Sequence, residues 1–530
     1  MRQRQELGVP FRFTRSCSCG RRFRSRLTTG AGVLFVLAVL FPQSVFAVDV
    51  FFNGERVADI ALLRRRSSPQ VVADEPVTGV SLGEVLPLLF ELSGGRVRHA
   101  GGHAALPGTM EPDELFRTAL FHDDEAWHLS LPNRVLRNVT EIRVRGLPLD
   151  TDQLSVWLSW EGTDVIRSEI GRFGELFGID IDVSTIPNTQ SKLTATERAR
   201  GTPADVALIQ SSDLPDLLEF GAIQPLDGLP EALTRGSGRE GVTAYSSMDA
   251  SVQAFAADGH LWADSLYFDS HLVFYNTELL NDPIPHDWTL GDLERRARGL
   301  RRQVEVPLTW NAYSAYWLTP FILGFGKDAI VSPDGRVHVD DEPTRRAIEY
   351  ILGLIDAGTL TVMERDAMTA FFTSGRAGLI LTGSYAIPAF ERLGIPFGVA
   401  PYPLVHETGR PVRPFLDFKG FAVARRARHP ALARRFIAYM TSPAVQARVT
   451  LPIRKMPADP VAWPLVVDKH PYAAALVRSY EIGVPVPNER GYTVYKSLMW
   501  RMLRFVFNDQ MTVEQMLARS EQMLSAAGNE

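Results

Sequence analysis

Carboxylates stand directly beside aromatic residues at two places in the chain. The stretch "SWEG" contains Trp160 and Glu161, and the stretch "HLWADSLYFDSHLVFYNTELL" contains Tyr267, Phe268 and Asp269 in succession. Carboxylate oxygens accept hydrogen bonds from hydroxyl groups, and aromatic faces pack against C–H groups, so this pairing suits a small polyhydroxylated ligand. A strand with one buried face would alternate apolar and polar residues. We therefore expect the second stretch to cross a ligand cleft.

Catalytic and metal-binding patterns are weak. The sequence contains no H-E-x-x-H, G-x-S-x-G or phosphate-binding glycine motif. His99 and His103 are four residues apart, but they flank two glycines and lack a third ligand. We expect neither a metal site nor a cofactor. In an alternative interpretation, Glu161 and Asp269 form the carboxylate pair of a glycosidase.

The length and charge of the chain limit the classes of protein to which it can belong. With 530 residues, of which 45% are hydrophobic, it should form more than one domain, because single cores stop growing at roughly 250 to 300 residues. The net charge is −5, and residues 1–47 carry eight arginines and one glutamate, so removing their +7 leaves −12. An acidic chain disfavours nucleic acid as a partner.

The N-terminal segment has the features of a secretory signal. A basic region precedes an apolar run from Ala31 to Phe41, and small residues end at Ala47, where we expect cleavage. The alternative is a retained membrane anchor, although a spanning helix needs about 20 apolar residues. Cys17 and Cys19 would leave with the signal, and no cysteine follows the apolar run. We expect a periplasmic protein without a lipid anchor or disulfides.

A small α+β domain is expected over residues 48–150. Strand patterns occur at residues 48–54, 126–132 and 139–147, and a helical pattern at residues 80–92. The polar, proline-containing stretch "RGLPLDTDQ" indicates a linker to the next domain.

From residue 151 onward, strand and helix patterns alternate. The strand "SVWLSW" precedes a helix that Asp164 can cap and Gly178 ends, and the strand "IDIDVS" follows. In the next unit, the buried strand "VALI" precedes a helix capped by Ser212 or Asp213 and closed by Gly221. Repeated β-α units predict an α/β fold with a largely parallel sheet and a ligand at the carboxyl ends of its strands.

Several of these segments, in the same order, resemble the maltose-binding-protein group of extracellular solute-binding proteins, which serve ABC sugar importers. The similar segments include "VWLSWEG", "PADVALIQSSDLPDLLEFGAIQPLD", "AMTAFFTSGRAGLILTGSYAI" and "FAVARRARHPALARRFIAYMTSP". The resemblance implies a two-lobed periplasmic-binding-protein fold (type II) over residues 151–530. Its first lobe would comprise residues 151–267 and 422–470, and its second residues 271–416 and 474–530. The chain would cross between the lobes within residues 260–280 and 415–424, with the ligand held between them.

The resemblance also implies a set of ligand-binding positions: Trp160, Glu161, Asp213, Asp269, Tyr316, Tyr385, Lys496 and Trp500. The sequence departs from the family pattern at several of them. In "LIQSSD" the family's aromatic and basic residues are missing, and Asp213 is a helix cap in the alternative interpretation. Tyr385 replaces a larger stacking ring. Lys496 and Trp500 exchange the family's order of an aromatic and a basic residue.

These features favour a periplasmic substrate-binding component of an ABC importer. It would capture a sugar or related small polar solute and deliver it to a membrane permease, without catalysis and as a monomer. The alternatives are a periplasmic carbohydrate-active hydrolase, or a ligand-sensing scaffold in which residues 48–150 dock another protein.

Overall fold

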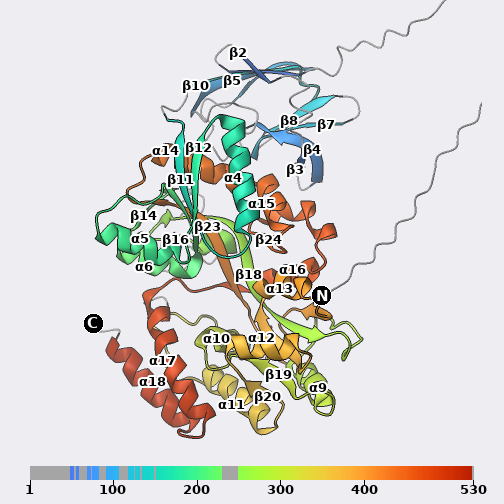
Figure 1. Ribbon diagram of the computed structural model, residues 1–530, viewed down its shortest axis with the longest axis vertical. Coiled ribbons are helices and arrows are strands. Elements are labelled where there is room, and N and C mark those ends of the chain that lie inside the picture. Colours follow the sequence, from blue (N-terminus) through green and yellow to red (C-terminus); the bar gives the residue numbers. More distant parts are fainter. Residues whose placement is uncertain are drawn as a thin grey trace, which may run out of the picture. The chain divides into compact units, whose positions relative to one another are not determined.

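The computed structural model describes residues 48–52, 55–58, 68–72, 75–82, 91–106, 117–123, 126–131, 134–147, 151–228, 249–332 and 334–527 (Figure 1). The expected secretory signal and most of the helix expected at residues 80–92 lie outside these ranges. Within them, no helix combines the length and apolar character that crossing a membrane requires.

Two five-stranded sheets make up the described part of residues 48–147. The first has the order β2-β1-β10-β5-β6 and consists of β1 (Asp49–Phe52), β2 (Glu55–Ala58), β5 (Glu91–His99), β6 (Gly102–Leu106) and β10 (Glu141–Leu147). The second has the order β3-β4-β7-β8-β9 and consists of β3 (Ser68–Val72), β4 (Glu75–Ser81), β7 (Ala119–His122), β8 (Trp127–Leu131) and β9 (Arg134–Leu136). Buried residues of both sheets, among them Val97, Leu120 and Ile142, share one core. The three expected strand regions correspond to β1, β8 and β10.

The first lobe begins with the expected β-α-β unit: β11 (Gln153–Leu158), α4 (Thr163–Phe177) and β12 (Asp180–Thr185), with β11 and β12 paired in parallel. Asp164 does not cap α4, because it is the second residue of the helix; the N-cap position is occupied by Gly162, whose φ of 77° is left-handed. Gly178, with φ 68°, ends the helix and donates its N–H to the carbonyl of Gly174.

The second unit leads from a strand to the edge of the site. It contains α5 (Thr189–Arg198), β13 (Val206–Gln210), the 3₁₀ turn η1 (Ser211–Asp213) and α6 (Leu214–Glu219). Asp213 occupies the N-cap position of α6, as the alternative interpretation expected, but its side chain makes no capping hydrogen bond. Short elements follow: β14 (Ile223–Gln224), β15 (Asp227–Gly228), α8 (Ala250–Gln253), β16 (Ala256–Ala257) and β17 (His260–Leu261).

Two long strands, β18 (Asp264–Asn276) and β23 (Phe415–Ala424), connect the lobes. β18 pairs with β23 as far as Ser270 and with β21 and β22 from His271 onward. β23 also pairs with β13 of the first lobe, so the main sheet has the order β12-β11-β13-β23-β18-β21-β19-β20. Every residue of β18 after the first is buried, which explains the missing alternation in its sequence. The stretches at residues 260–280 and 415–424, where the crossings were expected, contain these two strands.

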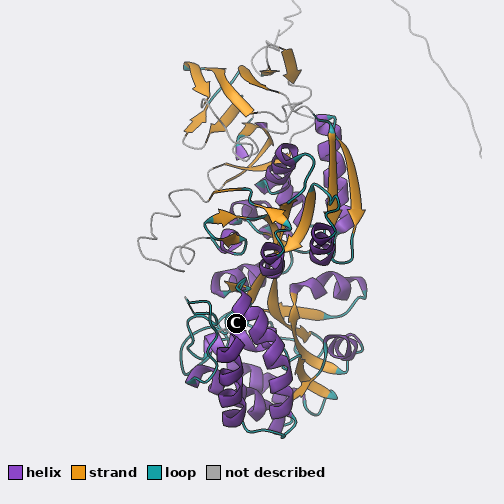
Figure 2. Cartoon of the chain, turned by 90° about the vertical axis from the view of Figure 1, so that its left-hand side faces the viewer, coloured by secondary structure: helices purple, strands orange, loops and turns teal. Residues whose placement is uncertain are grey.

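Helices lie on both sides of the second-lobe strands (Figure 2). Val273 and Tyr275 of β18 belong to one core, and Leu272 and Phe274 belong to a second core on the other side of the strand. The elements of this lobe are α9 (Leu290–Leu300), β19 (Val306–Trp310), α10 (Ala315–Gly324), α11 (Glu342–Asp356), β20 (Leu360–Val362), α12 (Arg365–Thr373), β21 (Ala377–Gly383), η3 (Ser384–Ala386), α13 (Ile387–Arg392), β22 (Phe397–Ala400), α17 (Arg490–Phe507) and α18 (Val513–Ala527).

The segment after β23 completes both lobes. It contains α14 (Pro430–Met440), α15 (Pro443–Thr450), β24 (Met456–Pro457), η4 (Pro460–Leu465), η5 (Val467–Lys469), α16 (Ala473–Ile482) and β25 (Val484–Pro485). On α15, the Arg448 guanidinium donates to Glu169 Oε1 of α4 at 2.7 Å and to Ser68 Oγ of β3 at 3.2 Å. α15 therefore contacts both the first lobe and the leading sheets.

Candidate functional site

The crossing strands place three charged residues in one row. Asp269 of β18 lies directly opposite Asp417 of β23 in the antiparallel register, and β24 pairs with β18 on the other edge. The register of β24 continues to Lys455, which lies beside Asp269. Two carboxylates directly opposite each other repel, so this row requires nearby cations.

Buried lysines supply these cations. Lys455 Nζ donates to Asp269 Oδ1 at 2.5 Å, and Lys419 Nζ lies 2.9 Å from Asp417 Oδ2 and 3.4 Å from Asp269 Oδ2. Ser384 Oγ of the second lobe adds a hydrogen bond to Asp269 Oδ1 at 2.7 Å. We call these five residues the crossing network.

The crossing network fixes the charge of Asp269. Burial alone would raise the pKa of this carboxyl, but the ammonium groups of Lys455 and Lys419 outweigh it and hold the pKa below its usual value. Likewise, burial alone would lower the pKa of Lys419, whereas the carboxylates of Asp417 and Asp269 raise it. Asp269, expected from the sequence at the ligand, is 5% exposed and bonded to protein groups.

Asp213 and Lys496 approach the crossing network from opposite lobes. Gln210 Nε2 donates to Asp213 Oδ1 at 3.3 Å. Burial raises the pKa of Asp213 to about 7, and the charge of Asp417 adds to the rise. Burial lowers the pKa of Lys496 on α17, while the carboxylates of Asp417 and Asp213 act in the opposite direction. The structure therefore brings these two expected residues near each other, around Asp417.

Two expected tyrosines lie on the second-lobe side. The Tyr316 ring lies 4.6 Å from that of His271 and 5.4 Å from that of Phe415. Burial raises the pKa of Tyr316 well above its usual value, and the charges of Asp417 and Tyr385 add to this effect. Tyr385 is partly buried, and its hydroxyl lies 3.2 Å from Thr382 Oγ1. Both rings thus belong to the same neighbourhood as Asp417.

The first-lobe loop after β11 carries Trp160 and Glu161. Trp160 has a left-handed φ of 68° and packs, partly buried, against the first-lobe core. Glu161 is exposed. Burial raises the pKa of the Tyr267 hydroxyl on β18, and the charge of Glu161 is one of the smaller contributions in the same direction. This loop therefore faces the crossing strands.

Trp500 lies apart from the other expected residues. Its side chain is 48% exposed on α17, where the Arg504 guanidinium lies 4.4 Å from its ring. The same guanidinium lies 4.4 Å from the Tyr313 ring and pairs with Glu364. Lys496 and Trp500 are one helical turn apart on α17. Lys496 faces the crossing network, whereas Trp500 lies on the surface.

Sequence reasoning missed Asp417, Lys419 and Lys455. A compositional signal could have found the lysines: the chain has only six among its 56 basic residues. Three of those six, Lys419, Lys455 and Lys496, lie in or beside the crossing network. In a chain that otherwise uses arginine, a buried lysine indicates a place where a compact point charge is required.

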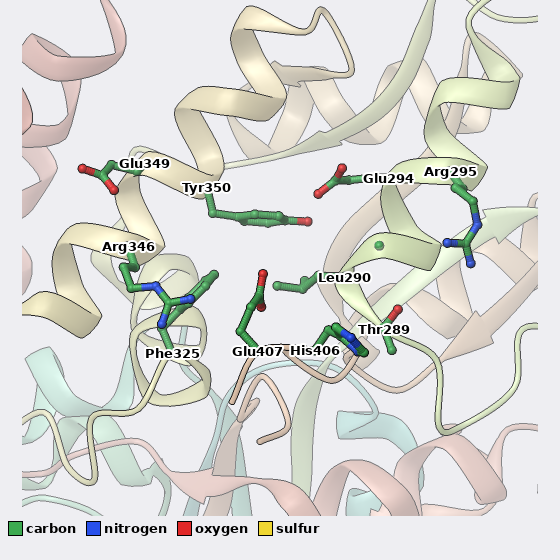
Figure 3. Close-up of a pocket in the computed structure, with 11 residues that line it drawn as sticks. Thr289, Leu290, Glu294, Arg295, Phe325, Arg346, Glu349, Tyr350, His406 and Glu407 are labelled. Carbon is green, nitrogen blue, oxygen red and sulfur yellow. The ribbon is translucent and has the colours of Figure 1, made fainter. Parts of the chain in front are cut away.

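Two surface hollows lie away from these residues. The larger, about 680 Å³, lies in the second lobe between α9, α11 and the loop at His406 (Figure 3). Glu294, Tyr350 and Glu407 surround it, and Glu407 is exposed. The other hollow, about 530 Å³, lies along α4 and β12. None of the expected site residues lines either hollow, so we place the candidate site at the crossing strands, where residues of both lobes meet. Across the described ranges, no group of three or more metal-ligating side chains occurs.

Comparison with known proteins identifies the family. The family model described as bacterial extracellular solute-binding protein matches residues 170–462. The maltodextrin-binding protein MdxE of Bacillus subtilis is 22% identical over 257 residues, which cover 45% of this chain and 60% of that protein. The galactooligosaccharide-binding protein of the same organism is 22% identical over 308 residues, covering 55% and 69%. This chain thus spans less than two thirds of the first relative's length.

Solved structures show the same fold. A cyclo/maltodextrin-binding protein complexed with maltotetraose matches with a TM-score of 0.61 at 19% identity, covering 72% of this chain and 98% of the other. The GacH receptor of Streptomyces glaucescens matches with a TM-score of 0.60 at 18% identity, covering 71% and 98%. The two-lobed fold implied by the sequence is confirmed. Because the family model spans more than half of the chain, this protein belongs to the bacterial extracellular solute-binding proteins.

Proposed function

We propose that the protein captures a carbohydrate or a related small polar solute between its lobes and delivers it to the permease of an ABC importer. The observation that supports this most is that charged groups of both lobes act on one another around Asp417: Lys419 Nζ lies 2.9 Å from its carboxylate, and the charges of Asp417 and Asp213 act on Lys496 of the second lobe. A ligand that contacts both groups would favour closure of the lobes. The relatives named for maltodextrin and galactooligosaccharide support a sugar as that ligand.

We propose that polar and aromatic side chains contact different parts of the sugar. Glu161, Asp213 and Lys496 would exchange hydrogen bonds with sugar hydroxyls, and Tyr316 and Tyr385 would pack against the C–H face of the ring. Trp160 would support the loop that carries Glu161.

Two of the expected residues receive different roles. Asp269 would hold the crossing strands in register through Lys455 rather than touch the ligand, because its carboxylate is buried and bonded to protein groups. We leave Trp500 out of the site because it is exposed beneath Arg504.

No catalysis is required for this role. A glycosidase would need a carboxylate free to attack or to transfer a proton, whereas Asp269 is held by two lysines. We propose a monomeric binding protein that acts outside the cytoplasm after removal of residues 1–47. Residues 48–150 would form an accessory domain, and residues 151–530 would form the two lobes.

Isothermal titration calorimetry of residues 48–530 tests the proposal. The panel contains monosaccharides, maltotriose, maltotetraose and a galactooligosaccharide. We expect micromolar binding of at least one sugar, a free energy of about −8 kcal/mol. Tyr385→Ala and Asp213→Ala should each weaken that binding at least about tenfold, equivalent to about 1.4 kcal/mol.

Trp500→Ala provides the matched control, because it removes an aromatic side chain that lies outside the proposed site. Its affinity should stay within about twofold of the parent, a difference below about 0.5 kcal/mol. The proposal fails if no small solute binds, or if Trp500→Ala loses as much affinity as Tyr385→Ala.

A further inference from the structure

The leading sheet β2-β1-β10-β5-β6 has one face of arginines. Along β5 and β10, Val97, Ile142 and Val144 are buried, whereas Arg96, Arg98, Arg143 and Arg145 at alternate positions are exposed. We call the exposed side of this sheet the arginine face. Its basic residues are Arg56, Arg96, Arg98, Arg143 and Arg145.

The register places these arginines close together. Arg96 of β5 lies directly opposite Arg143 of β10, and Arg98 lies opposite Glu141 and, on its other side, His103. Like charges opposite each other destabilise a sheet pair. The pair Arg96–Arg143 therefore carries an electrostatic cost within the sheet.

The two acidic residues of the face are already paired. Arg56 pairs with Asp49, and the Arg143 guanidinium donates to both carboxylate oxygens of Glu141 at 2.8 and 2.9 Å. Among the side chains that the structure describes on this face, five arginines against two carboxylates leave a charge of +3. Arg96, Arg98 and Arg145 are exposed and have no ion-pair partner within the described residues.

This positive face is not a result of composition. Residues 48–147 contain eleven arginines, no lysine and fourteen Asp and Glu residues, so their net charge is −3. The charge of residues 48–530 as a whole is −12. A face of +3 on an acidic chain requires that the positive charge be segregated to one side of the sheet.

We propose that the arginine face docks on the surface of a membrane that contains anionic phospholipids. Neighbouring strands are about 4.8 Å apart and alternate residues along a strand about 7 Å apart. From β2 to β5 the arginines therefore form an array about 14 Å across and about 14 Å along the strands. A planar array matches a layer of phosphate headgroups. The guanidinium fork binds phosphate through two parallel hydrogen bonds, which distinguishes arginine from lysine.

An aromatic residue lies within the array. Phe51 of β1 is half-buried and lies in register with Arg143, whose guanidinium lies 4.1 Å from its ring. Aromatic residues favour the boundary between headgroups and acyl chains. This arrangement favours a lipid surface over an acidic protein. Docking through this face would keep the protein at the membrane without a lipid anchor.

Vesicle sedimentation tests the proposal. Residues 48–530 are mixed with vesicles of phosphatidylcholine alone or with about 30% phosphatidylglycerol, an anionic fraction that gives the negative surface potential required for attraction. Binding should require the anionic lipid and should fall as sodium chloride rises from about 0.05 M to 0.5 M, because salt shortens the Debye length.

Two variants with the same net charge distinguish binding through the arginine face from binding that depends only on the total charge of the protein. The first carries Arg96→Gln, Arg98→Gln and Arg145→Gln. The second replaces three exposed lobe arginines with glutamine: Arg302, Arg392 and Arg425. Each arginine near an anionic surface contributes roughly fivefold in affinity, so the first variant should bind on the order of 100-fold more weakly and the second within about threefold of the parent.

Circular dichroism and the sugar affinity of both variants should match those of the parent, because neither set touches the proposed ligand site. The proposal is overturned if the parent shows no preference for anionic vesicles, or if both variants lose binding equally. Binding to an acidic protein without binding to vesicles would also overturn it.

Discussion

Replacing Lys455 with methionine tests the crossing network most sharply. Lys455 is 1% exposed, and its ammonium group lies 2.5 Å from Asp269 Oδ1. Removing one partner of a buried ion pair costs about 3 to 5 kcal/mol, because the other charge stays buried without compensation. Lys419, at 3.4 Å, and the Ser384 hydroxyl, at 2.7 Å, still face the carboxylate. We therefore expect the lower end, a loss of about 3 kcal/mol in the free energy of unfolding.

Equilibrium urea denaturation, followed by tryptophan fluorescence, measures this loss. Lys469→Met is the matched control, because Lys469 is exposed and should change the free energy by less than about 0.5 kcal/mol. Adding Asp269→Asn to Lys455→Met removes the uncompensated charge, so the double variant should be about 1 to 2 kcal/mol more stable than Lys455→Met alone. If Lys455→Met costs less than about 1 kcal/mol, or if the two substitutions are additive, the ion pair between Lys455 and Asp269 does not stabilise the crossing strands.

Three further predictions concern titration and packing at the crossing strands. Burial lowers the pKa of His271 to about 3, so its contribution to stability is full above pH 6.5 and falls as the pH drops toward 3. His271→Phe should flatten this fall in urea denaturation measured between pH 3.5 and 7. If the free energy of unfolding of the variant falls with pH as steeply as that of the parent, the prediction is wrong. Burial raises the pKa of Asp213 to about 7, so its contribution to stability is full below pH about 4 and is lost as the pH rises through 7. Asp213→Asn should remove this loss in the same assay, whereas a profile identical to that of the parent would argue against desolvation of this half-buried carboxyl. A methyl group at Gly383 would lie 2.2 Å from Tyr385 Cε1, so Gly383→Ala should displace the ring and weaken sugar binding about tenfold by calorimetry; unchanged affinity would exclude Tyr385 from the site.

The crossing strands could be predicted from the sequence because burial on both faces removes the alternation of polar and apolar residues. The run Tyr267-Phe268-Asp269 shows this property, and β18 is buried along almost its whole length. The pairing partner of Asp269 could not be predicted, since Lys455 lies 186 residues away and no periodic pattern connects them. Their contact depends on the register between β18 and β24.

Helical spacing was also insufficient at α17. Lys496 and Trp500 are four residues apart, and residues at this spacing lie on neighbouring parts of a helix surface. The structure nevertheless directs Lys496 toward Asp417 and leaves Trp500 exposed beside Arg504. The tilt of a helix against its neighbours decides which of two adjacent positions faces a site, and a single sequence does not contain that tilt.

We propose that a sugar closes the two lobes over the crossing strands. Both cysteines of the chain, Cys17 and Cys19, precede residue 48, so spin labels at Glu219→Cys on α6 and Ser497→Cys on α17 would be the only thiol labels on residues 48–530. Double electron–electron resonance measures the distance between them with and without the sugar found by calorimetry. A saturating sugar should shorten this distance by more than about 2 Å and narrow its distribution. A distribution that is unchanged while calorimetry shows the sugar bound would contradict it.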